Sequence, residues 1–423
     1  MSVRAAHHDA LGSLLDEPID WRHKAFPAAE GVAIGTVGRM GWNLLRGDLL
    51  LPALVLKESA LGHNIAWMAR WFKERGILHA PHGKTTMAPQ IFKRQLDAGA
   101  WAITAATASQ VCTYRAFGVP RIFLANELVE PAAVRWLARE LAASPELDFY
   151  CLVDSAAAVE SMTEELSGSE RPVQVLVEIG FEGGRTGCRT IAEAVDVAAA
   201  VARSPSLELV GTEGYEGLIG GDRSDSAIAA VDDFLRRLRE ATVELERRGA
   251  FGRRERVIVS AGGSAYFDRV AEVLGADWNF DRAVDLVVRA GGYVTHDVGL
   301  YVRSSPIAQE LRPALEVWGA VLSRPEPELA LVGLGKRDVS HDVDLPLPQL
   351  VHDPDGLRRA TGMTVTALND QHAYVRVPPD EPLGVGDLLG CGISHPCTAF
   401  DKWRLIPVVD DDYTVVDAIA TFF

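Results

Sequence analysis

The sequence has little cysteine and no long run of apolar residues. A membrane-spanning helix needs about 18 or more consecutive apolar residues, and no stretch of this chain reaches that length. Residues 1–16 contain no compact apolar segment, which argues against a secretory signal and favours a cytoplasmic location. The cysteines are odd in number and scattered, a pattern typical of a reducing compartment with free thiols or a metal site. They are Cys112, Cys151, Cys188, Cys391 and Cys397.

Positive charge is also scarce. The chain has 42 Lys and Arg against 58 Asp and Glu, a net charge of −16. This acidic excess argues against nucleic acid or an anionic membrane as a partner. It does not exclude an anionic small molecule as a ligand, because binding of a small molecule depends on the charge around its site and not on the net charge of the chain. The content of 48% hydrophobic and 24% charged residues is typical of a globular protein, and 423 residues favour two domains.

Eight short apolar segments alternate with helical patterns between residues 77 and 292. Continuous apolar strands that alternate with helices are typical of parallel strands covered by helices. Eight such units in about 220 to 250 residues predict an α/β fold with a (β/α)8 TIM-like barrel, and a doubly wound open sheet is the alternative. The expected strands are a segment that opens at Ile77, then 101–105, 121–126, 147–154, 173–179, 207–215, 257–260 and 286–289.

The pattern changes after about residue 305. Short apolar segments separated by proline and glycine turns predict a C-terminal, mostly antiparallel β domain. Its expected strands are 315–322, 329–332, 363–368 and 373–377. We therefore expect three parts: an N-terminal segment, 1–57, that partly packs with the β domain; a barrel, 58–305; and the β domain, 306–423.

One lysine in the barrel region stands where a strand is expected to end. Lys84 lies in the stretch 80–86, after the apolar pair Ile77-Leu78 and before a helical pattern. In barrels of this kind, the C-terminal ends of the strands carry the catalytic residues. A lysine that is partly desolvated there has a lowered pKa and can serve as an amine nucleophile. The alternative is a solvent-facing loop residue, since lysine is mostly exposed.

Two glycine-containing stretches follow the last two expected strands. Paired glycines let backbone N–H groups approach an anion, and barrels commonly hold phosphate in the loops after strands 7 and 8. Each pair alone is also consistent with a tight turn. The candidate phosphate-binding residues are Ser260, Gly262, Gly263, Ser264, Gly291 and Gly292. An amine for imine formation together with a phosphate site is what pyridoxal 5′-phosphate requires.

A second candidate site lies in the C-terminal part, in the stretch 392–401. His395 and Cys397 are two residues apart, so in a strand their side chains would point to the same face. An imidazole nitrogen and a thiolate suit Zn²⁺. Two ligands alone are equally consistent with a buried histidine beside an inert cysteine.

Several stretches together resemble one known family, the fold type III or alanine-racemase-like pyridoxal-phosphate enzymes. The nearest branch is the one that contains D-serine dehydratase and D-threonine aldolase. The matching stretches are 81–89 with 95–100, which resembles the cofactor-lysine segment; 259–264, its phosphate loop; 178–187, its Gly-Arg-x-Gly segment; and 211–217, its strand with a cofactor-side tyrosine. The resemblance runs from about residue 40 to residue 410, and the order and spacing of these stretches make it specific.

The resemblance implies a role for individual residues. Lys84 would hold the cofactor through its amine and later move the α-proton of the substrate. Arg185 would face the phenolic oxygen of the cofactor, Tyr215 would border its pyridine ring, and Arg289 would lie opposite the ring nitrogen. The glycine stretches would bind its phosphate. The alternative for each arginine is an ion pair in the barrel wall.

The resemblance also extends to the metal pair. His395 and Cys397 resemble the metal ligands of D-serine dehydratase, whereas related aldolases and hydroxyaspartate dehydratases often place a carboxylate near the second position and use Mn²⁺ or Mg²⁺. Cys397 therefore favours Zn²⁺ and a dehydratase. The stretch 369–372 stands where the family has a different turn, so Asp370 and His372 are only candidate partners of the metal ligands.

The implied activity is that of a metal-assisted lyase. It would dehydrate a D-β-hydroxy amino acid such as D-serine or D-threonine to a 2-oxo acid and ammonia, and the D configuration comes from the resemblance alone. An aldolase of the D-threonine type or an amino-acid racemase on the same fold is the alternative. A non-catalytic cofactor carrier is a third possibility, against which the β domain counts. The resemblance further implies a homodimer in which the partner's β domain closes the barrel.

Overall fold

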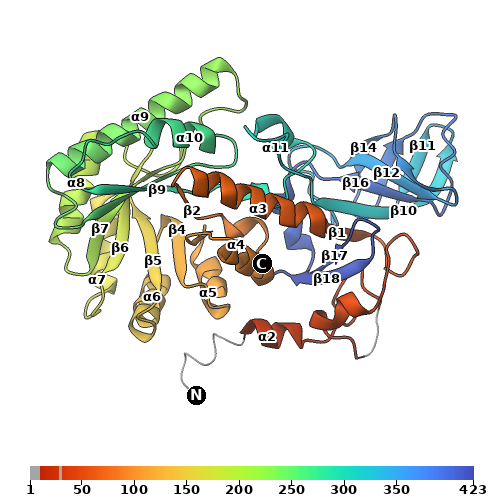
Figure 1. The fold of residues 1–423 in the computed structure, drawn as a ribbon, viewed down its shortest axis with the longest axis horizontal. Coiled ribbons are helices and arrows are strands. Elements are labelled where there is room, and N and C mark those ends of the chain that lie inside the picture. Colours follow the sequence, from red (N-terminus) through yellow and green to blue (C-terminus); the bar gives the residue numbers. More distant parts are fainter. Residues whose placement is uncertain (1–9, 28–30) are drawn as a thin grey trace.

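The computed structural model describes residues 10–27 and 31–423, which form two sheets (Figure 1). The first sheet is parallel and eight-stranded, in the order β2-β9-β8-β7-β6-β5-β4-β3. Its strands are β2 Leu78–His79, β3 Ile103–Ala105, β4 Arg121–Glu127, β5 Asp148–Val153, β6 Val173–Ile179, β7 Leu207–Gly214, β8 Arg256–Ala261 and β9 Ala283–Val288. All eight expected segments form strands here, so the predicted fold class is confirmed. Residues 1–9, part of the stretch expected to carry no secretory signal, lie outside the described residues.

Helices follow the strands and cover the outer face of this sheet (Figure 1). They are α3 Glu58–Glu74, α4 Pro89–Asp97, α5 Ala108–Ala116, α6 Pro131–Ala143, α7 Ala156–Glu165, α8 Ile191–Arg203, α9 Asp225–Arg247 and α10 Phe267–Leu274. Polar side chains cap the first turn of several of them. Ser155 caps α7, and Thr190 with Glu193 forms a capping box at α8; such caps satisfy the first N–H groups of a helix.

The sheet curls until its two edge strands meet. Trp101 N–H donates to the His79 carbonyl (2.7 Å), and Thr104 N–H donates to the Pro81 carbonyl (2.9 Å). Buried side chains from the strands fill the interior, as is usual for a barrel of this size. They include Ala80, Phe123, Leu152, Leu176, Val210, Ile258 and Val287. Because the interior is packed, the space for a ligand lies at the rim, beyond the strand ends.

The second sheet has ten strands and is mostly antiparallel (Figure 1). Its strands are β1 Ala53–Lys57, β10 Leu315–Glu326, β11 Leu329–Val332, β12 Leu347–Asp353, β13 Gly356–Arg359, β14 Thr364–Leu368, β15 Ala373–Arg376, β16 Leu388–Gly392, β17 Leu405–Val409 and β18 Val415–Ala420. The four strands expected after residue 305 are β10, β11, β14 and β15. β1 pairs with both β10 and β17, so a strand from the N-terminal segment lies within the C-terminal sheet. The division of the chain at residues 57 and 305 stays a prediction.

The segment after β9 joins the two sheets. It contains the short helix α11 (Leu300–Ser304), which lies between them in Figure 1. Val298 N–H donates to the Ile393 carbonyl and Leu300 N–H donates to the Ser394 carbonyl, both at 3.0 Å. These bonds hold the loop after β16 against the barrel rim, which brings the two candidate sites of the sequence analysis into one region.

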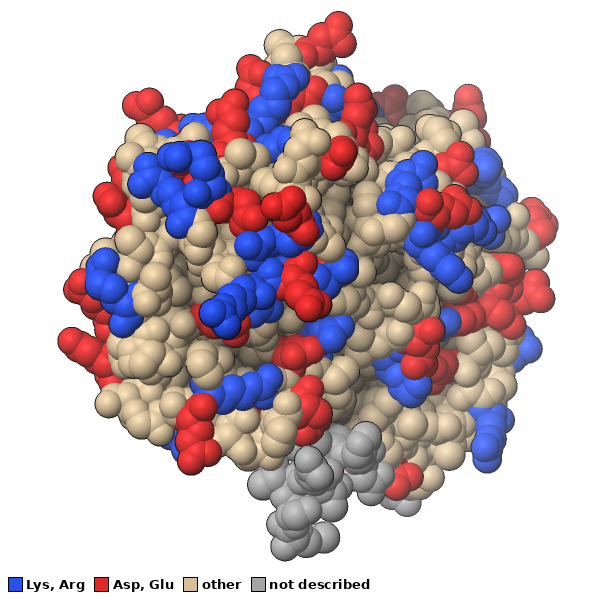
Figure 2. Space-filling view, turned by 60° about the vertical axis from the view of Figure 1, so that its left-hand side comes forward, with Lys and Arg blue, Asp and Glu red and all other residues tan. Residues whose placement is uncertain are grey.

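The surface carries both signs of charge. In the view of Figure 2, basic and acidic side chains lie side by side, and no continuous basic surface is present on that face. Arg254 pairs with Glu208, and Arg256 pairs with Asp285. None of the helices in the described part of the chain is long and apolar enough to cross a membrane.

Candidate active site

A cavity of about 430 Å³ lies beyond the C-terminal ends of the barrel strands. This is where barrels of this kind carry their active sites, and the size is in the range of small-molecule sites. Ten of the residues predicted from the sequence line it. They are Lys84, Arg185, Tyr215, Gly263, Ser264, Arg289, Gly291, Gly292, His395 and Cys397. Ser260 and Gly262 lie outside the lining.

Lys84 lies in a short 3₁₀ helix, η2 (Gly83–Thr85), just after β2. Gly83 has no room for a side chain, because a Cβ there would lie 2.6 Å from the Tyr114 hydroxyl oxygen. The turn therefore packs closely on α5 and has a defined position. Lys84 is exposed to the cavity, while protein surrounds it elsewhere. Burial lowers the pKa of Lys84 and the charge of Arg185 acts in the same direction, which increases the fraction of uncharged amine.

Arg289 lies directly after β9 and is 2% exposed. Its guanidinium donates hydrogen bonds to the Glu213 carboxylate and to Ser260 Oγ. Ser260 Oγ donates to the Val287 carbonyl (3.1 Å), so this side chain is engaged with the barrel wall and with Arg289. Burial raises the pKa of Glu213, whereas Arg289 lowers it. Arg289 thus forms an ion pair in the barrel wall, the alternative named in the sequence analysis. It also lines the cavity.

The glycine stretch after β8 is held by a buried carboxylate that the sequence analysis missed. Gly262 and Gly263 donate their N–H groups to Glu216 (3.0 and 2.8 Å). Gly262 has a φ of 96°, a conformation that favours glycine. Ser264 Oγ accepts a hydrogen bond from Gly292 N–H (3.1 Å) and so joins the two stretches. In this structure, two of the amides predicted for phosphate are therefore bonded to Glu216.

Arg185 lies on a loop that two carboxylates fasten to the barrel. Its guanidinium lies over the ring of Tyr215, 4.7 Å from the ring centroid, which is a cation–π geometry. Thr186 Oγ1 donates to Glu178 (2.9 Å), and Gly187 N–H donates to Asp154 (3.0 Å). The backbone on the C-terminal side of Arg185 is thus tied to the ends of β5 and β6.

The expectation that His395 and Cys397 lie in a strand is wrong. β16 ends at Gly392, and Pro396 begins a 3₁₀ turn, η4 (Pro396–Thr398). Proline fixes φ at a value that suits the first position of a helical turn. His395 keeps an extended backbone. The two side chains still meet and form a hydrogen bond, because the turn brings Cys397 back towards His395.

Groups from both sheets surround this pair. His395 Nδ1 lies 2.6 Å from Asp342 Oδ2, and Thr85 Oγ1 lies 3.4 Å from Cys397 Sγ. The hydrogen bond with Cys397, together with the interaction with Asp342, raises the pKa of His395 to about 9. Burial disfavours ionisation of Cys397, but the hydrogen bond and charge of His395 lower its pKa below the usual value. A thiolate is the form that binds metal.

The turn at 369–372 does not take part in this site. It connects β14 and β15, all four residues are exposed, and none lines the cavity. Asp370 pairs instead with Arg337 (3.2 Å). Asp342 is the carboxylate that contacts the histidine, and a carboxylate on the second nitrogen of a metal-binding histidine is the usual arrangement.

The residues present suit pyridoxal phosphate in the barrel half of the cavity and a divalent metal in the other half. A Cβ at Gly263 would lie 3.0 Å from the Tyr215 ring, and one at Gly292 would lie 2.4 Å from the Tyr301 ring. Each glycine thus packs directly against a tyrosine ring of the cavity lining and has no room for a side chain of its own. An amine of lowered pKa faces the same space. The pair of imidazole and thiol supplies the nitrogen and sulfur donors that zinc prefers.

Several lining residues escaped the sequence analysis. Tyr301, Glu178 and Glu213 line the cavity, and Asp342 lies behind His395. Glu178 and Glu213 lie near the C-terminal ends of expected apolar strands, and this position could have marked them as candidate site residues. Tyr301 lies in the five-residue helix α11 and Asp342 in an irregular segment, and neither segment is long enough for a periodicity to mark these residues.

Two family profiles match the chain. The profile "Alanine racemase, N-terminal domain" matches residues 56–278, and the profile "Putative serine dehydratase domain" matches residues 314–409. D-threonine aldolase of Arthrobacter sp. is 26% identical over 382 residues, which is 90% of this chain and 94% of the relative.

Solved structures show the same fold. D-threonine aldolase from Filomicrobium marinum superposes with a TM-score of 0.75 at 23% identity and covers 91% of this chain and 98% of its own. D-threo-3-hydroxyaspartate dehydratase from Delftia sp. HT23 gives a TM-score of 0.72 at 22% identity and covers 90% and 99%. One structure of that dehydratase is of a variant in a metal-free form.

The fold and the cavity define a pyridoxal-phosphate enzyme of fold type III. The first profile covers more than half of the 423 residues, and the chain belongs to the alanine racemase N-terminal domain family. Within that class it lies in the branch of the serine dehydratase domain and of D-threonine aldolase.

Proposed function

We propose that the protein is a pyridoxal-phosphate-dependent, metal-assisted dehydratase. Its substrate would be a D-β-hydroxy amino acid such as D-serine or D-threonine, and its products a 2-oxo acid and ammonia. One observation carries the proposal: Thr85 Oγ1 lies 3.4 Å from Cys397 Sγ. The candidate metal ligands therefore lie beside the residue that follows Lys84, so a single small substrate can reach both.

In this proposal the barrel half binds the cofactor. When bound, pyridoxal phosphate withdraws electrons from the α-carbon of an amino acid. Lys84 would hold it, and the uncharged amine of Lys84 would take the α-hydrogen of the substrate. Arg185 would lie at the phenolic oxygen and Tyr215 beside the ring, while Glu213 would hold Arg289 near the ring nitrogen. The phosphate would lie against Gly263, Ser264, Gly291 and Gly292.

The other half would bind the metal and the β-hydroxyl. His395 and Cys397 would hold a divalent ion, for which their donor atoms favour Zn²⁺ over Mn²⁺ or Mg²⁺. Such an ion supplies Lewis acidity, which makes a hydroxyl a better leaving group. Asp342 would hold the His395 ring in one orientation. Loss of water followed by hydrolysis would convert D-serine to pyruvate and ammonia.

The second candidate is a retro-aldol lyase that splits D-threonine into glycine and an aldehyde. The similarity to D-threonine aldolase over 90% of the chain favours it. The same residues would serve both reactions, because a metal held by His395 and Cys397 would supply Lewis acidity at the β-oxygen in each case. A racemase needs neither ligand of the metal pair.

The test is a product assay on the purified protein. D-serine, D-threonine and their L forms are incubated with and without EDTA, and the products are identified. We expect a keto acid from the D forms and its loss with EDTA. An aldehyde with glycine would replace the dehydratase by the aldolase, and the enantiomer alone, insensitive to EDTA, would replace both by a racemase.

We also propose that the protein is cytoplasmic and forms a homodimer with each cavity near the interface. Residues 58–305 would bind the cofactor and residues 306–423 the metal, while 1–57 would pack partly on the latter. Twofold pairing is the commonest symmetry of soluble oligomers. Light scattering is expected to give twice the 45.8 kDa of one chain; an active monomer would exclude the dimer.

A further inference from the structure

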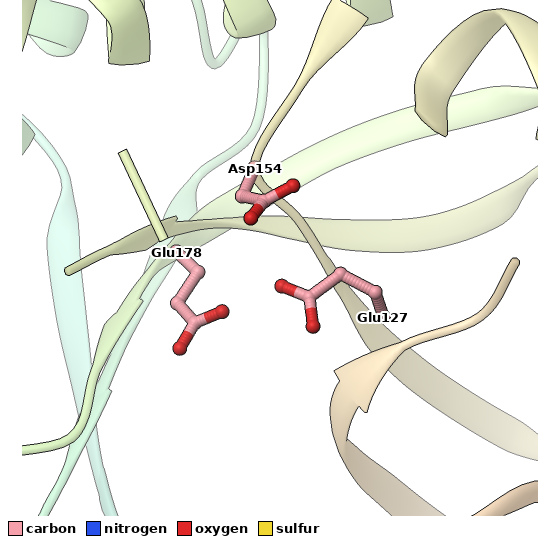
Figure 3. A group of neighbouring side chains, drawn as sticks. All are labelled: Glu127, Asp154 and Glu178. Carbon is pink, nitrogen blue, oxygen red and sulfur yellow. The ribbon is translucent and has the colours of Figure 1, made fainter. Parts of the chain in front are cut away.

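Three carboxylates that have no role in the proposed reaction converge at the barrel rim. Glu127 ends β4, Asp154 follows β5 directly, and Glu178 lies near the end of β6 (Figure 3). The strands are neighbours in the parallel sheet, so their C-terminal ends bring the side chains together. One oxygen from each residue lies within 4.8 Å of the others.

Some oxygens of this cluster already have partners. Glu178 Oε1 accepts a hydrogen bond from Thr186, and Asp154 Oδ2 accepts one from Gly187 N–H. Both donors belong to the loop that carries Arg185. The cluster thus has one side turned to this loop.

The other side of the cluster is buried, and no N–H or hydroxyl group of the described residues donates to it; Glu127 and Glu178 contact each other there. Glu178 is 4% exposed, and its Oε2 has no hydrogen-bond partner within the described residues. The same holds for both carboxylate oxygens of Glu127. In Figure 3 the Glu178 carboxylate points towards Glu127, and the Asp154 carboxylate faces both. Buried polar groups are normally hydrogen-bonded, so oxygens that face one another without donors need either a proton shared between them or a cation.

The chemistry of the three carboxylates indicates which cation they would bind. When all three groups are ionised, they bring three negative charges into a small, partly buried volume, which is costly unless a cation compensates them; without one, burial and the neighbouring Glu178 raise the pKa of Glu127. Oxygen-only donor sets suit Mg²⁺, Ca²⁺ and Mn²⁺. They are poor competitors for zinc against the nitrogen and sulfur donors of His395 and Cys397.

We propose that Glu127, Asp154 and Glu178 bind one hard divalent cation, separate from the ion at His395 and Cys397. The loop that holds Arg185 shares two of these carboxylates, so the ion also fixes the position of this loop. The proposal does not depend on the reaction proposed above, since it needs only the three side chains.

Mn²⁺ is the probe, because it binds oxygen ligands and is visible by electron paramagnetic resonance. The His395→Ala variant removes the other site, and Mn²⁺ is titrated into this variant, loaded with pyridoxal phosphate, by calorimetry and by resonance spectroscopy. We expect one bound Mn²⁺ per chain. No saturable Mn²⁺ binding to the His395→Ala protein would overturn the proposal.

Ligand variants then locate the ion. Glu127→Gln and Glu178→Gln, each added to His395→Ala, are isosteric and remove one charge. Loss of a residue that only orients a ligand already costs about 10- to 100-fold in metal affinity, so loss of a direct ligand is expected to cost at least about tenfold. The matched control is Glu182→Gln, an exposed residue of the same loop, which should leave the affinity unchanged. Equal affinity in all three variants would overturn the assignment.

A further test uses the wild-type protein, so its result does not depend on whether a variant folds. Saturation with Mn²⁺ after zinc loading should give one zinc and one manganese per chain by elemental analysis. Zinc alone, with the three carboxylates sharing a proton instead of an ion, would overturn the proposal.

Discussion

The cavity has two halves that are built differently. The barrel half consists of strand ends whose polar groups are buried and bonded to one another, as in the contacts of Arg289 with Glu213 and Ser260. The other half is a loop and a 3₁₀ turn, in which His395 is contacted by Asp342 from another loop. Among the described residues that line the cavity, the barrel half alone provides a lysine amine, that of Lys84. If the two halves bind the cofactor and the metal as proposed, each function can be removed by substitutions that leave the other intact.

The largest expected effect comes from the barrel half. In Lys84→Ala, activity should be lost by several orders of magnitude, because in the proposed function the amine both holds the cofactor and moves the proton. The visible absorption band of the bound cofactor should disappear as well. Absorption spectra and product assays measure the two effects.

Lys93→Ala is the matched control. Lys93 lies on the surface of α4 and pairs with Asp97, so its loss should leave band and activity intact. Reduction of the bound cofactor with borohydride, followed by peptide mapping, would contradict the assignment if the label appeared on any lysine other than Lys84.

The next effect comes from the loop half. His395→Ala or Cys397→Ser should abolish departure of the β-hydroxyl and remove the zinc, while the cofactor band of Lys84 remains. This outcome would separate the two halves directly. Elemental analysis gives the metal, and keto-acid formation from D-serine gives the activity.

Cys112→Ser controls for the loss of a thiol. This cysteine is exposed on α5 and should not change zinc content. Full turnover by a metal-free, cofactor-loaded His395→Ala protein would refute the role of the metal.

A smaller effect is expected from Asp342, the carboxylate that contacts His395. Asp342→Asn keeps the size of the side chain but removes the charge next to His395 Nδ1. Metal affinity should fall by about 10- to 100-fold, as is usual for such partners, and excess zinc should restore activity. Competition with a zinc chelator measures the affinity. A loss of activity that zinc does not restore would mean that Asp342 acts in another way.

The smallest effect is one of pH on the barrel half. Burial lowers the pKa of Lys84 below the ordinary value of 10.5, and only the uncharged amine reacts with the cofactor. The rate at which the cofactor-free protein takes up pyridoxal phosphate should therefore rise with pH and level off below pH 10.5. Stopped-flow absorbance measures this rate. A midpoint at or above 10.5 would contradict the lowered pKa.

The two sheets also differ in how well the sequence predicts them. Every strand of the parallel sheet was expected, because strands covered on both faces read as continuous apolar runs. In the antiparallel sheet β12 was missed, since only Val351 of its seven residues is buried. β17 is buried throughout but was also missed, because it lies beyond the turn that holds Cys397 and contains Pro407.

Local chemistry determined the barrel, the place of Lys84 after its first strand and the pairing of His395 with Cys397 as a candidate site. These features depend on the order of apolar and polar residues along a short stretch, so the sequence carries them. Only the tertiary structure shows which carboxylates contact the residues of the candidate site. Glu216 reaches Gly262 across 46 positions, and Asp342 reaches His395 across 53. Contacts of this kind arise from how strands and loops pack, and no periodicity within one segment encodes them.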